Sequence, residues 1–292
     1  MKTKAPIETS GVTPERRPLL VIAVGRQRVG KTSLLNTAAQ FLRAHGAQFS
    51  LWNADTLNKT YSLSRFHTDV LEPPSPDPED VKAWLEDRFT GLIRARGDAL
   101  LDIGGGDTPL ARLVHEVPLV QTLDRRGVRL VLVHVIGPEM ADLDYLERFL
   151  SDRLLAPEAT LIVMNKGLVL TGRSSGFAFS AVRQHPAMKI AMDAGAELAL
   201  MPSLPCMSRV TDRALTFADA MSGGEKPGHE PLSFFDQERV AVWWTRELPA
   251  FFAEIPRLWL PDMPGFVPPL AVEAQGTSDA TACAPMTAAA DA

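Results

Sequence analysis

Residues 25–32 read GRQRVGKT, and this stretch decides the fold. It matches the pattern G-x-x-x-x-G-K-T, a glycine-rich loop whose backbone N–H groups cradle nucleotide phosphates. The run LLVIAV at residues 19–24 precedes it and has the unbroken apolar character of a buried parallel strand. Residues 33–42 follow with the apolar spacing of a helix. A strand, a glycine loop and a helix in this order predict a phosphate-binding site where the helix begins.

The residue types of the loop have separate roles in such a site. Backbone N–H groups point at the phosphates, and the amino end of the helix adds a partial positive charge. Lys31 is expected to reach the β- and γ-phosphates, and the Thr32 hydroxyl is expected to ligate Mg²⁺. The predicted contacts with the nucleotide come from Gly25, Arg28, Val29, Gly30, Lys31, Thr32 and Ser33.

Composition and charge narrow the class of protein. The chain has 292 residues, of which 46% are hydrophobic and 22% charged, as in ordinary globular proteins. Its net charge of −5 excludes a general binder of polyanions, so any contact with nucleic acid needs a local basic patch. The two cysteines, Cys206 and Cys283, are far apart and indicate neither a disulfide framework nor a zinc site. Without a signal-peptide core or a membrane-length apolar run, we expect a cytoplasmic protein.

Apolar runs alternate with amphipathic segments along the chain. Strands are expected at 19–24, 48–53, 98–103, 128–136, 159–165 and 196–201, and helices near 31–45, 79–96, 109–126, 139–153, 180–194, 208–221 and 235–255. This alternation predicts the α/β class, with a doubly wound, mostly parallel sheet and helices on both faces. We expect one domain over 18–260, a flexible leader over 1–17 and a disordered tail over 261–292.

The stretch ALLDIGGGD at residues 99–107 predicts a second part of the site. An apolar strand delivers Asp102 to the sheet edge, where a carboxylate holds Mg²⁺ directly or through water. The glycines that follow let the next loop approach the γ-phosphate and change shape on hydrolysis. The alternative for Asp102 is a turn cap, and the P-loop earlier in the chain favours the metal role.

Three further residues follow expected strands. Asp55 lies at the end of the second strand, where it either orients the attacking water or caps a turn. Asn165 and Lys166 resemble a base-recognition corner, and Leu168 stands where a guanine site would place an aspartate, so we expect adenine. The Asn165 amide offers both a donor and an acceptor to the base. Pro202 either closes over the same ring or simply terminates the last strand.

These motifs resemble the ParA/MinD family of deviant Walker A ATPases, over about residues 19–255. The resemblance implies a P-loop NTPase fold of the SIMIBI type. It places Lys31 and Thr32 on the P-loop lysine and threonine, and Asp102 on the metal-binding aspartate of the third strand. It makes Asn165 the adenine-reading asparagine and Asp55 the carboxylate that positions water.

The chain departs from the family pattern in the loop and in the second strand. Arg26 replaces the signature lysine that reaches into a partner subunit, and residues 27–28 are Gln-Arg instead of two glycines. Asn53 replaces the first aspartate of the strand-2 pair. Arg26 keeps the charge, so it is predicted to act in catalysis across a dimer together with Lys31 and Asp55; its alternative is a solvated loop charge.

The resemblance implies a switch that binds ATP and Mg²⁺, closes into a homodimer and hydrolyses ATP slowly when a partner protein triggers it. The expected task is the positioning or partitioning of cargo such as plasmid DNA. The alternatives are a weakly hydrolysing accessory protein in DNA transfer or assembly, and a small-molecule kinase or amide-forming enzyme.

Two surfaces are candidates for the output of such a switch. Non-specific DNA contacts are expected from late basic residues that could equally be solvated charges, namely Arg173, Arg183, Lys189, Arg209 and Arg213. The aromatic segment over 240–252 carries little positive charge, so we expect a final helix packed on the core and not a membrane anchor; a docking site for a partner is the third option.

Overall fold

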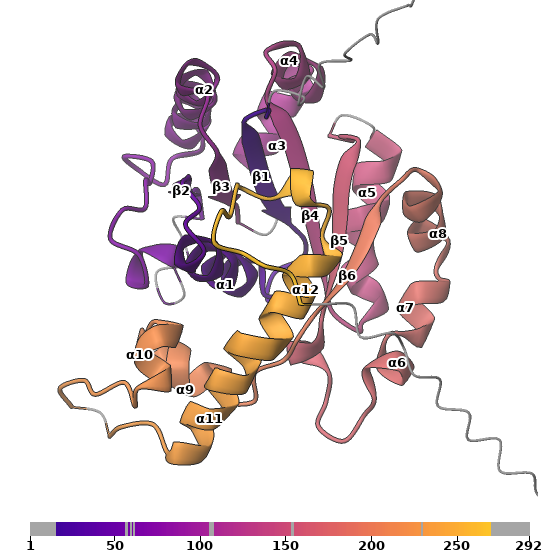
Figure 1. Cartoon of the computed structure of the whole chain (residues 1–292). Helices are drawn as coiled ribbons and strands as arrows, with labels where there is room; N and C mark the ends of the chain where they lie inside the picture. The colour runs from indigo at the N-terminus through magenta and orange to yellow at the C-terminus, as the bar shows by residue number, and fades with distance from the viewer. Residues whose placement is uncertain are drawn as a thin grey trace, which may run out of the picture.

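The computed structural model describes residues 16–55, 58, 60, 62–104, 108–152, 155–228 and 230–269 (Figure 1). Most of the expected leader and tail, and the expected loop residues 105–107, lie outside these ranges. One six-stranded sheet forms the centre, in the order β2-β3-β1-β4-β5-β6. Its strands are β1 (Leu19–Val24), β2 (Ser50–Asn53), β3 (Ala99–Asp102), β4 (Arg129–Ile136), β5 (Ala159–Asn165) and β6 (Glu197–Met201). All neighbouring strands are parallel, which confirms the predicted fold class.

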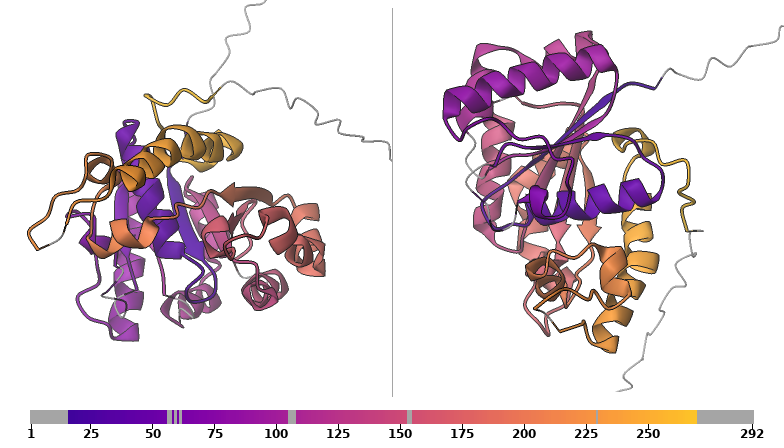
Figure 2. Two further views of the ribbon diagram at one scale, coloured as in Figure 1. Left: turned by 90° about the horizontal axis from the view of Figure 1, so that it is seen from below. Right: turned by 90° about the vertical axis from the view of Figure 1, so that its left-hand side faces the viewer.

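Helices cover both faces of the sheet (Figure 2). One face carries α1 (Lys31–Ala44), α9 (Met207–Asp212), α10 (Phe217–Met221), α11 (Phe234–Val242) and α12 (Leu248–Glu254). The other carries α2 (Pro78–Ala95), α3 (Thr108–Glu116), α4 (Leu119–Arg125), α5 (Asp144–Asp152), α7 (Ser180–Gln184) and α8 (Pro186–Asp193). The remaining short elements are α6 (Ser175–Ala178) and the 3₁₀ turns η1 (Leu63–Arg65), η2 (Met140–Leu143), η3 (Lys166–Leu168) and η5 (Arg257–Trp259).

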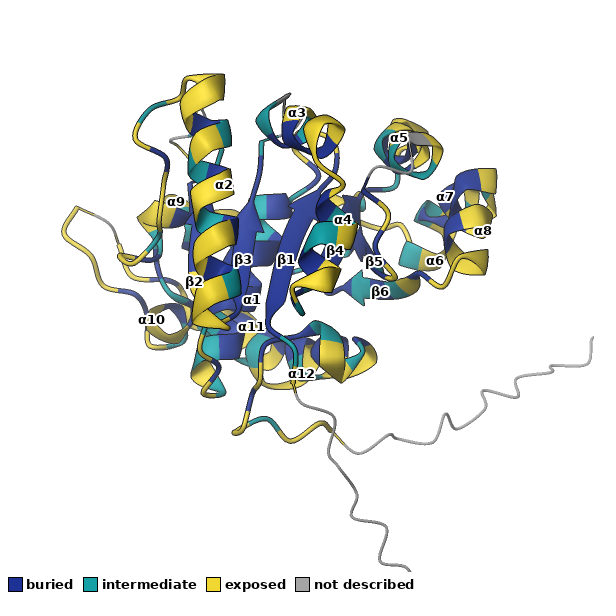
Figure 3. Ribbon diagram, turned by 90° about the horizontal axis from the view of Figure 1, so that it is seen from above, coloured by how far each residue is buried: buried dark blue, intermediate teal, exposed yellow. Residues whose placement is uncertain are grey.

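The alternation of side chains along β1 explains the two layers. Leu19, Val21 and Ala23 belong to the core under α1 and α12, whereas Leu20 and Ile22 belong to the core under α2, α3 and α4. Successive residues of a strand point to opposite faces, so a strand that is apolar throughout must be covered on both sides. Figure 3 shows the result, with buried strands between helices whose outer surfaces are exposed.

Prolines divide two of the expected helices. The segment expected over 109–126 is α3 followed by α4, with Pro118 as the residue that caps α4. The segment expected over 180–194 is α7 followed by α8, which begins at Pro186. Proline has no N–H for the helical hydrogen bond and disfavours helical backbone in the residue before it, so each break follows from local chemistry.

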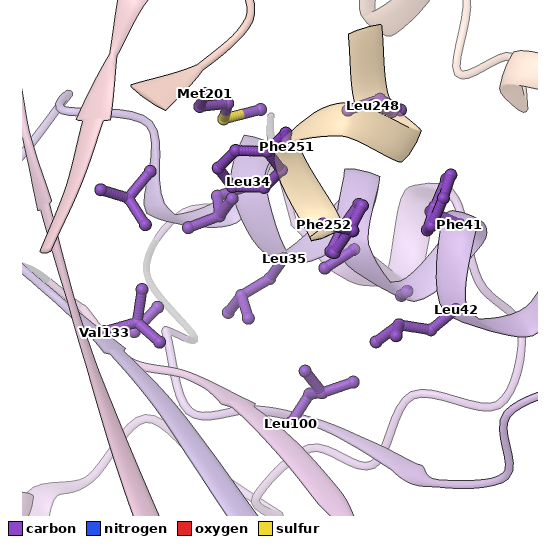
Figure 4. Packing of buried hydrophobic residues seen from close by; sticks show 14 of the residues in the cluster. Leu34, Leu35, Phe41, Leu42, Leu100, Val133, Met201, Leu248, Phe251 and Phe252 are labelled. Atoms are coloured by element: carbon purple, nitrogen blue, oxygen red, sulfur yellow. The ribbon is translucent and has the colours of Figure 1, made fainter. Parts of the chain in front are cut away.

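The expected final helix is one long element with an irregular middle. A π-helical turn, Trp243–Glu247, joins α11 to α12, and Pro249 stands in the first turn of α12. Phe252 stacks on Phe41 of α1 with ring centroids 4.3 Å apart, in the cluster that Figure 4 shows. A small apolar cavity of about 40 Å³ remains between α1, α12 and the sheet. The expected packing of this segment on the core is therefore present.

The packed part of the chain continues beyond residue 260. Met263 is buried, and the Phe266 ring contacts the Phe41 ring edge-on. The N–H of Gly265 donates to the carbonyl of His45 at the end of α1. The first residues of the expected tail thus pack on the core. No helix within the described ranges combines the length and apolar character that crossing a bilayer requires.

Candidate nucleotide-binding site

The chemistry-bearing residues meet at the carboxyl edge of the sheet. In the strand register Asp102 of β3 stands beside Ala23 of β1 and Asn53 of β2. Asn165 ends β5 beside Met201, the last residue of β6. The P-loop leaves β1 at the same edge, as expected where the central strands of an open parallel sheet end.

The backbone of the P-loop has positive φ angles at three positions. They are 143° at Gly25, 66° at Arg28 and 97° at Gly30, and Val29 between the last two does not share this conformation. Such an alternation turns successive N–H groups toward one concavity, which binds anions. A Cβ on Gly25 would lie 2.5 Å from the carbonyl oxygen of Val135, so this position has no room for a side chain.

Lys31 is buried at the start of α1 and bends back over the loop. Its Nζ donates to the carbonyl oxygens of Gly25 and Arg26, both at 3.1 Å. Burial lowers the pKa of Lys31, and the negative charges of Asp102 and Asp55 oppose this shift. The lysine therefore lies near both carboxylates that the sequence singled out.

Thr32 and Asp102 form the innermost polar contact of the site. The Thr32 hydroxyl donates to Asp102 Oδ2 at 2.6 Å, and Asp102 is only 1% exposed. Burial raises the pKa of Asp102 to about 7, and the hydrogen bond from Thr32 opposes this. Among the described residues, Asp102 Oδ1 has no hydrogen-bond partner although it is buried.

This pair fits Mg²⁺. A buried carboxylate oxygen without a partner is costly, and a bound cation would remove that cost. Mg²⁺ prefers oxygen ligands and commonly takes one or two carboxylates together with water and nucleotide phosphates. Thr32 and Asp102 supply such oxygens beside the P-loop.

Asp55 lies half-buried after β2, and its carboxylate packs against Gly104, which follows β3. A Cβ on Gly104 would lie 3.4 Å from Oδ1 of Asp55. Its backbone N–H donates to the side-chain oxygen of Asn53 at 3.1 Å. The amide nitrogen of Asn53 donates to Ser62 Oγ at 3.0 Å and to Glu72 Oε1 at 2.8 Å. Asn53, which the sequence presented only as a departure, therefore holds Asp55 and the segment after β2 in place.

Arg26 lies beside the site but is paired within its own chain. Its Nη1 is 3.0 Å from Glu139 Oε2 and 3.6 Å from Asp142 Oδ1, just after β4. Asp142 is also fixed by the N–H of Gly137 at 2.9 Å, and burial raises its pKa. Sequence reasoning missed Glu139 and Asp142, because nothing local relates them to a loop more than a hundred residues earlier.

Asn165 contacts the P-loop directly. Its amide nitrogen donates to the carbonyl of Val29 at 2.9 Å, and its oxygen accepts the N–H of Gly167 at 2.9 Å. Pro202 is buried after β6, and its carbonyl accepts the indole N–H of Trp243 at 3.1 Å. The base-reading roles of Asn165 and Pro202 stay predictions.

The basic residues expected to contact DNA are mostly engaged locally. Arg209 makes two hydrogen bonds of 2.7 Å with the buried carboxylate of Asp236. Arg213 donates to the carbonyl of Arg209, and Lys189 pairs with Asp193 at 2.8 Å one helical turn away. Arg173 and Arg183 are exposed. Lys189 and Arg209 are exposed too, and the DNA surface stays a prediction.

Comparisons with known proteins place the fold in context. No protein-family model matches the chain, and no curated protein matches it. The cell division protein MinD from Aquifex aeolicus is 15% identical, with a TM-score of 0.41 over 77% of this chain and 95% of that one. The septum site-determining protein MinD from Pyrococcus horikoshii OT3, complexed with Mg-ADP, is 18% identical, with a TM-score of 0.45 over 79% and 97%.

A third similar structure belongs to a different protein. It is the signal recognition particle 54 kDa protein from Aeropyrum pernix K1 in complex with GDP, 19% identical, with a TM-score of 0.39 over 73% of this chain and 55% of that one. The fold assignment itself rests on the parallel strand order and the P-loop between β1 and α1. The similarity to these solved structures concerns the fold alone.

Proposed function

We propose that this protein is an ATP-binding switch that uses Mg²⁺ and hydrolyses ATP slowly. The observation that carries the proposal is the contact between Thr32 and Asp102 beside the P-loop, with a buried carboxylate oxygen still free of a partner among the described residues. Lys31 lies next to this pair and is buried. One cation and one carboxylate at the amino end of a helix are suited to a phosphate chain with its metal.

Each residue of the cluster has a part in this activity. Mg²⁺, held by Thr32 and Asp102, would neutralise charge on the phosphate oxygens. Lys31 exchanges its two carbonyl partners for phosphate oxygens, which compensate its charge better than neutral carbonyls do. Asp55 is held by Asn53 beside Gly104, where it would orient the attacking water.

Adenine is the proposed base. The proposal rests on Leu168, a partly exposed leucine at the position where a guanine site would need a carboxylate. Asn165 already uses one donor and one acceptor within the chain, so one N–H and one lone pair of its amide remain for a base. This limited capacity suits orientation of the base more than strong binding.

The proposed output is a nucleotide-dependent homodimer that positions cargo such as plasmid DNA in the cytoplasm under a partner protein's control. The alternative is a weakly hydrolysing ATP-binding accessory protein. One observation favours the alternative: Arg26, the residue expected to act across a dimer, is paired to Glu139 and Asp142 in its own chain.

Calorimetric titration with Mg-ATP, Mg-ADP and Mg-GTP tests the proposed site. Wild type should bind the adenine nucleotides more tightly than GTP, and Lys31→Ala should abolish binding. Lys82→Ala is the matched control, since Lys82 lies on α2 and pairs with Glu86 of the same helix and Glu116 of α3. Failure of wild type to bind any nucleotide would overturn the proposal.

Turnover and solution mass then separate the switch from the accessory protein. In the switch, Mg-ATP but not Mg-ADP doubles the mass by light scattering, and Asp55→Asn lowers ATP consumption while ATP binding persists. Unchanged turnover in Asp55→Asn would refute the role of Asp55. A mass that stays the same with every nucleotide would favour the accessory protein.

A further inference from the structure

Two arginines of the P-loop have opposite surroundings. Arg26 is held by Glu139 and Asp142, which neutralise it locally. Arg28 is exposed, and within the described part of the chain it has neither an ion pair nor a hydrogen bond. The family resemblance favours Arg26 for phosphate contact, but Arg26 is already paired with carboxylates of its own chain. Arg28, two residues later, is exposed and available for that contact.

The backbone of Arg28 makes its identity informative. Its φ angle of 66° is in the left-handed region, where glycine is favoured over any residue with a Cβ. The anion-binding curvature of the loop requires this conformation at residue 28, followed by the reversal at Val29 and the positive φ of Gly30. Glycine would satisfy the backbone better, so the arginine is costly to the fold. Strain of this kind concentrates at functional sites.

The electrostatics of the loop support the same conclusion. Of its cations, Lys31 lies close to Asp102 and Asp55, and Arg26 lies close to Glu139 and Asp142. Arg28 is exposed and forms no ion pair with a described carboxylate, so its positive charge has no partner there. A guanidinium binds phosphate oxygens through two parallel N–H donors, which makes it well suited to the added charge of a terminal phosphate.

We propose that Arg28, and not Arg26, is the arginine that contacts the terminal phosphate of the bound nucleoside triphosphate. The proposal rests on the ATP site proposed above and assigns to this side chain the discrimination between ATP and ADP. The phosphate belongs either to the nucleotide of the same subunit or to that of a second copy. The chemistry of the contact is the same in both cases.

Titration calorimetry with ADP and with a slowly hydrolysed ATP analogue tests this assignment. Arg28→Gln removes the charge while keeping a side chain at the same backbone position. It should weaken binding of the ATP analogue roughly 10-fold or more, the usual effect of losing one charge-assisted hydrogen bond, and change ADP binding by less than about 3-fold. Arg28→Lys should recover part of the loss, because it restores charge without the planar fork.

Arg96 provides a matched control. It is another exposed arginine at positive φ, 56°, at the end of α2, and it touches no part of the P-loop. Arg96→Gln should leave both affinities unchanged. Arg26→Gln completes the set, and it should affect the ratio of ATP to ADP affinity less than Arg28→Gln does.

The outcomes distinguish this proposal from the proposed function. If Lys31→Ala abolishes binding but Arg28→Gln keeps the wild-type ratio of ATP to ADP affinity, the assignment of Arg28 is wrong and the ATP site stands. A larger loss in Arg26→Gln than in Arg28→Gln also overturns it. If wild type binds no nucleotide, the proposed function fails first. A loss seen at protein concentrations where wild type is monomeric places the contact within one subunit, and a loss confined to dimer-forming concentrations places it across the dimer.

Discussion

His67 connects the helix that follows the P-loop to the segment after β2, and its protonation is expected to weaken the fold. Its Nε2 lies 3.0 Å from Asn36 Oδ1, and its Nδ1 lies 3.1 Å from Nη1 of Arg43, both on α1. Arginine only donates, so Nδ1 is the acceptor and Nε2–H donates to Asn36. A charged ring would lose the acceptor and place a second cation beside Arg43. Burial, reinforced by the charge of Arg43, lowers the pKa of His67 from 6.5 to about 4.

The magnitude follows from this difference in pKa. Between pH 6.5 and about 4 the unfolded chain binds a proton at His67 that the folded chain does not bind, so stability falls as the pH falls through this window. One pKa unit corresponds to about 1.4 kcal/mol, which makes the full loss on the order of 3 kcal/mol. Most of this loss of stability should have occurred by pH 4.5.

Urea unfolding at pH 7.5 and pH 4.5 measures the effect in wild type and in His67→Gln. The glutamine offers both a donor and an acceptor but does not titrate, so the variant should lose less stability on acidification than wild type. Buried His134, whose pKa burial lowers to about 3, titrates in both proteins and cancels in the difference. His115→Gln, at an exposed position on α3, is the control and should behave as wild type. Equal acid sensitivity of His67→Gln and wild type would refute the reasoning.

Three further substitutions test the fold and the loop. Gly30→Ala should abolish nucleotide binding in calorimetry. The φ angle of Gly30 is 97°, and the Cβ of alanine would lie 2.5 Å from the amide nitrogen of Asn165. Normal affinity would show that the loop is not held as described. Arg96→Gly should stabilise the fold by about 1 kcal/mol in urea unfolding, because glycine relieves the left-handed backbone, and a loss of stability would contradict that account. Phe252→Ala should lower the free energy of unfolding by about 3–5 kcal/mol in the same assay, because it removes a buried ring stacked on Phe41. A loss below about 1 kcal/mol would show that the aromatic core repacks freely.

The strands were predictable because each is a short apolar run that must be buried on both sides. The observed β1 and β5 coincide with the expected ranges, and the others differ by one or two residues at one end or, in β3, at both ends. The helix breaks at Pro118 and Pro186 follow from rules that apply to any sequence. Each expected helix nevertheless extended across its proline, because the apolar periodicity continues on both sides of it.

The site was predictable in part. The P-loop, Thr32 and Asp102 come together as the motifs indicate, because both motifs follow strands that end at one edge of the sheet. The partners of Arg26 were not predictable, since Glu139 and Asp142 reach it only through the packing of β4 beside β1. Long-range contacts of this kind depend on strand order, which local pattern does not specify.

The hydrogen bond from Asn165 to Val29 has a consequence for how the protein is made. The two residues are 136 positions apart, so the P-loop gains this support only after β5 has left the ribosome and joined the sheet. A nascent chain that ends before β5 contains the whole G-x-x-x-x-G-K-T motif but lacks the Asn165 side chain that donates to the loop carbonyl of Val29. Nucleotide at the proposed site would therefore stabilise only chains that extend past β5, and its binding energy would enter the folding reaction after more than half of the 292 residues have been made.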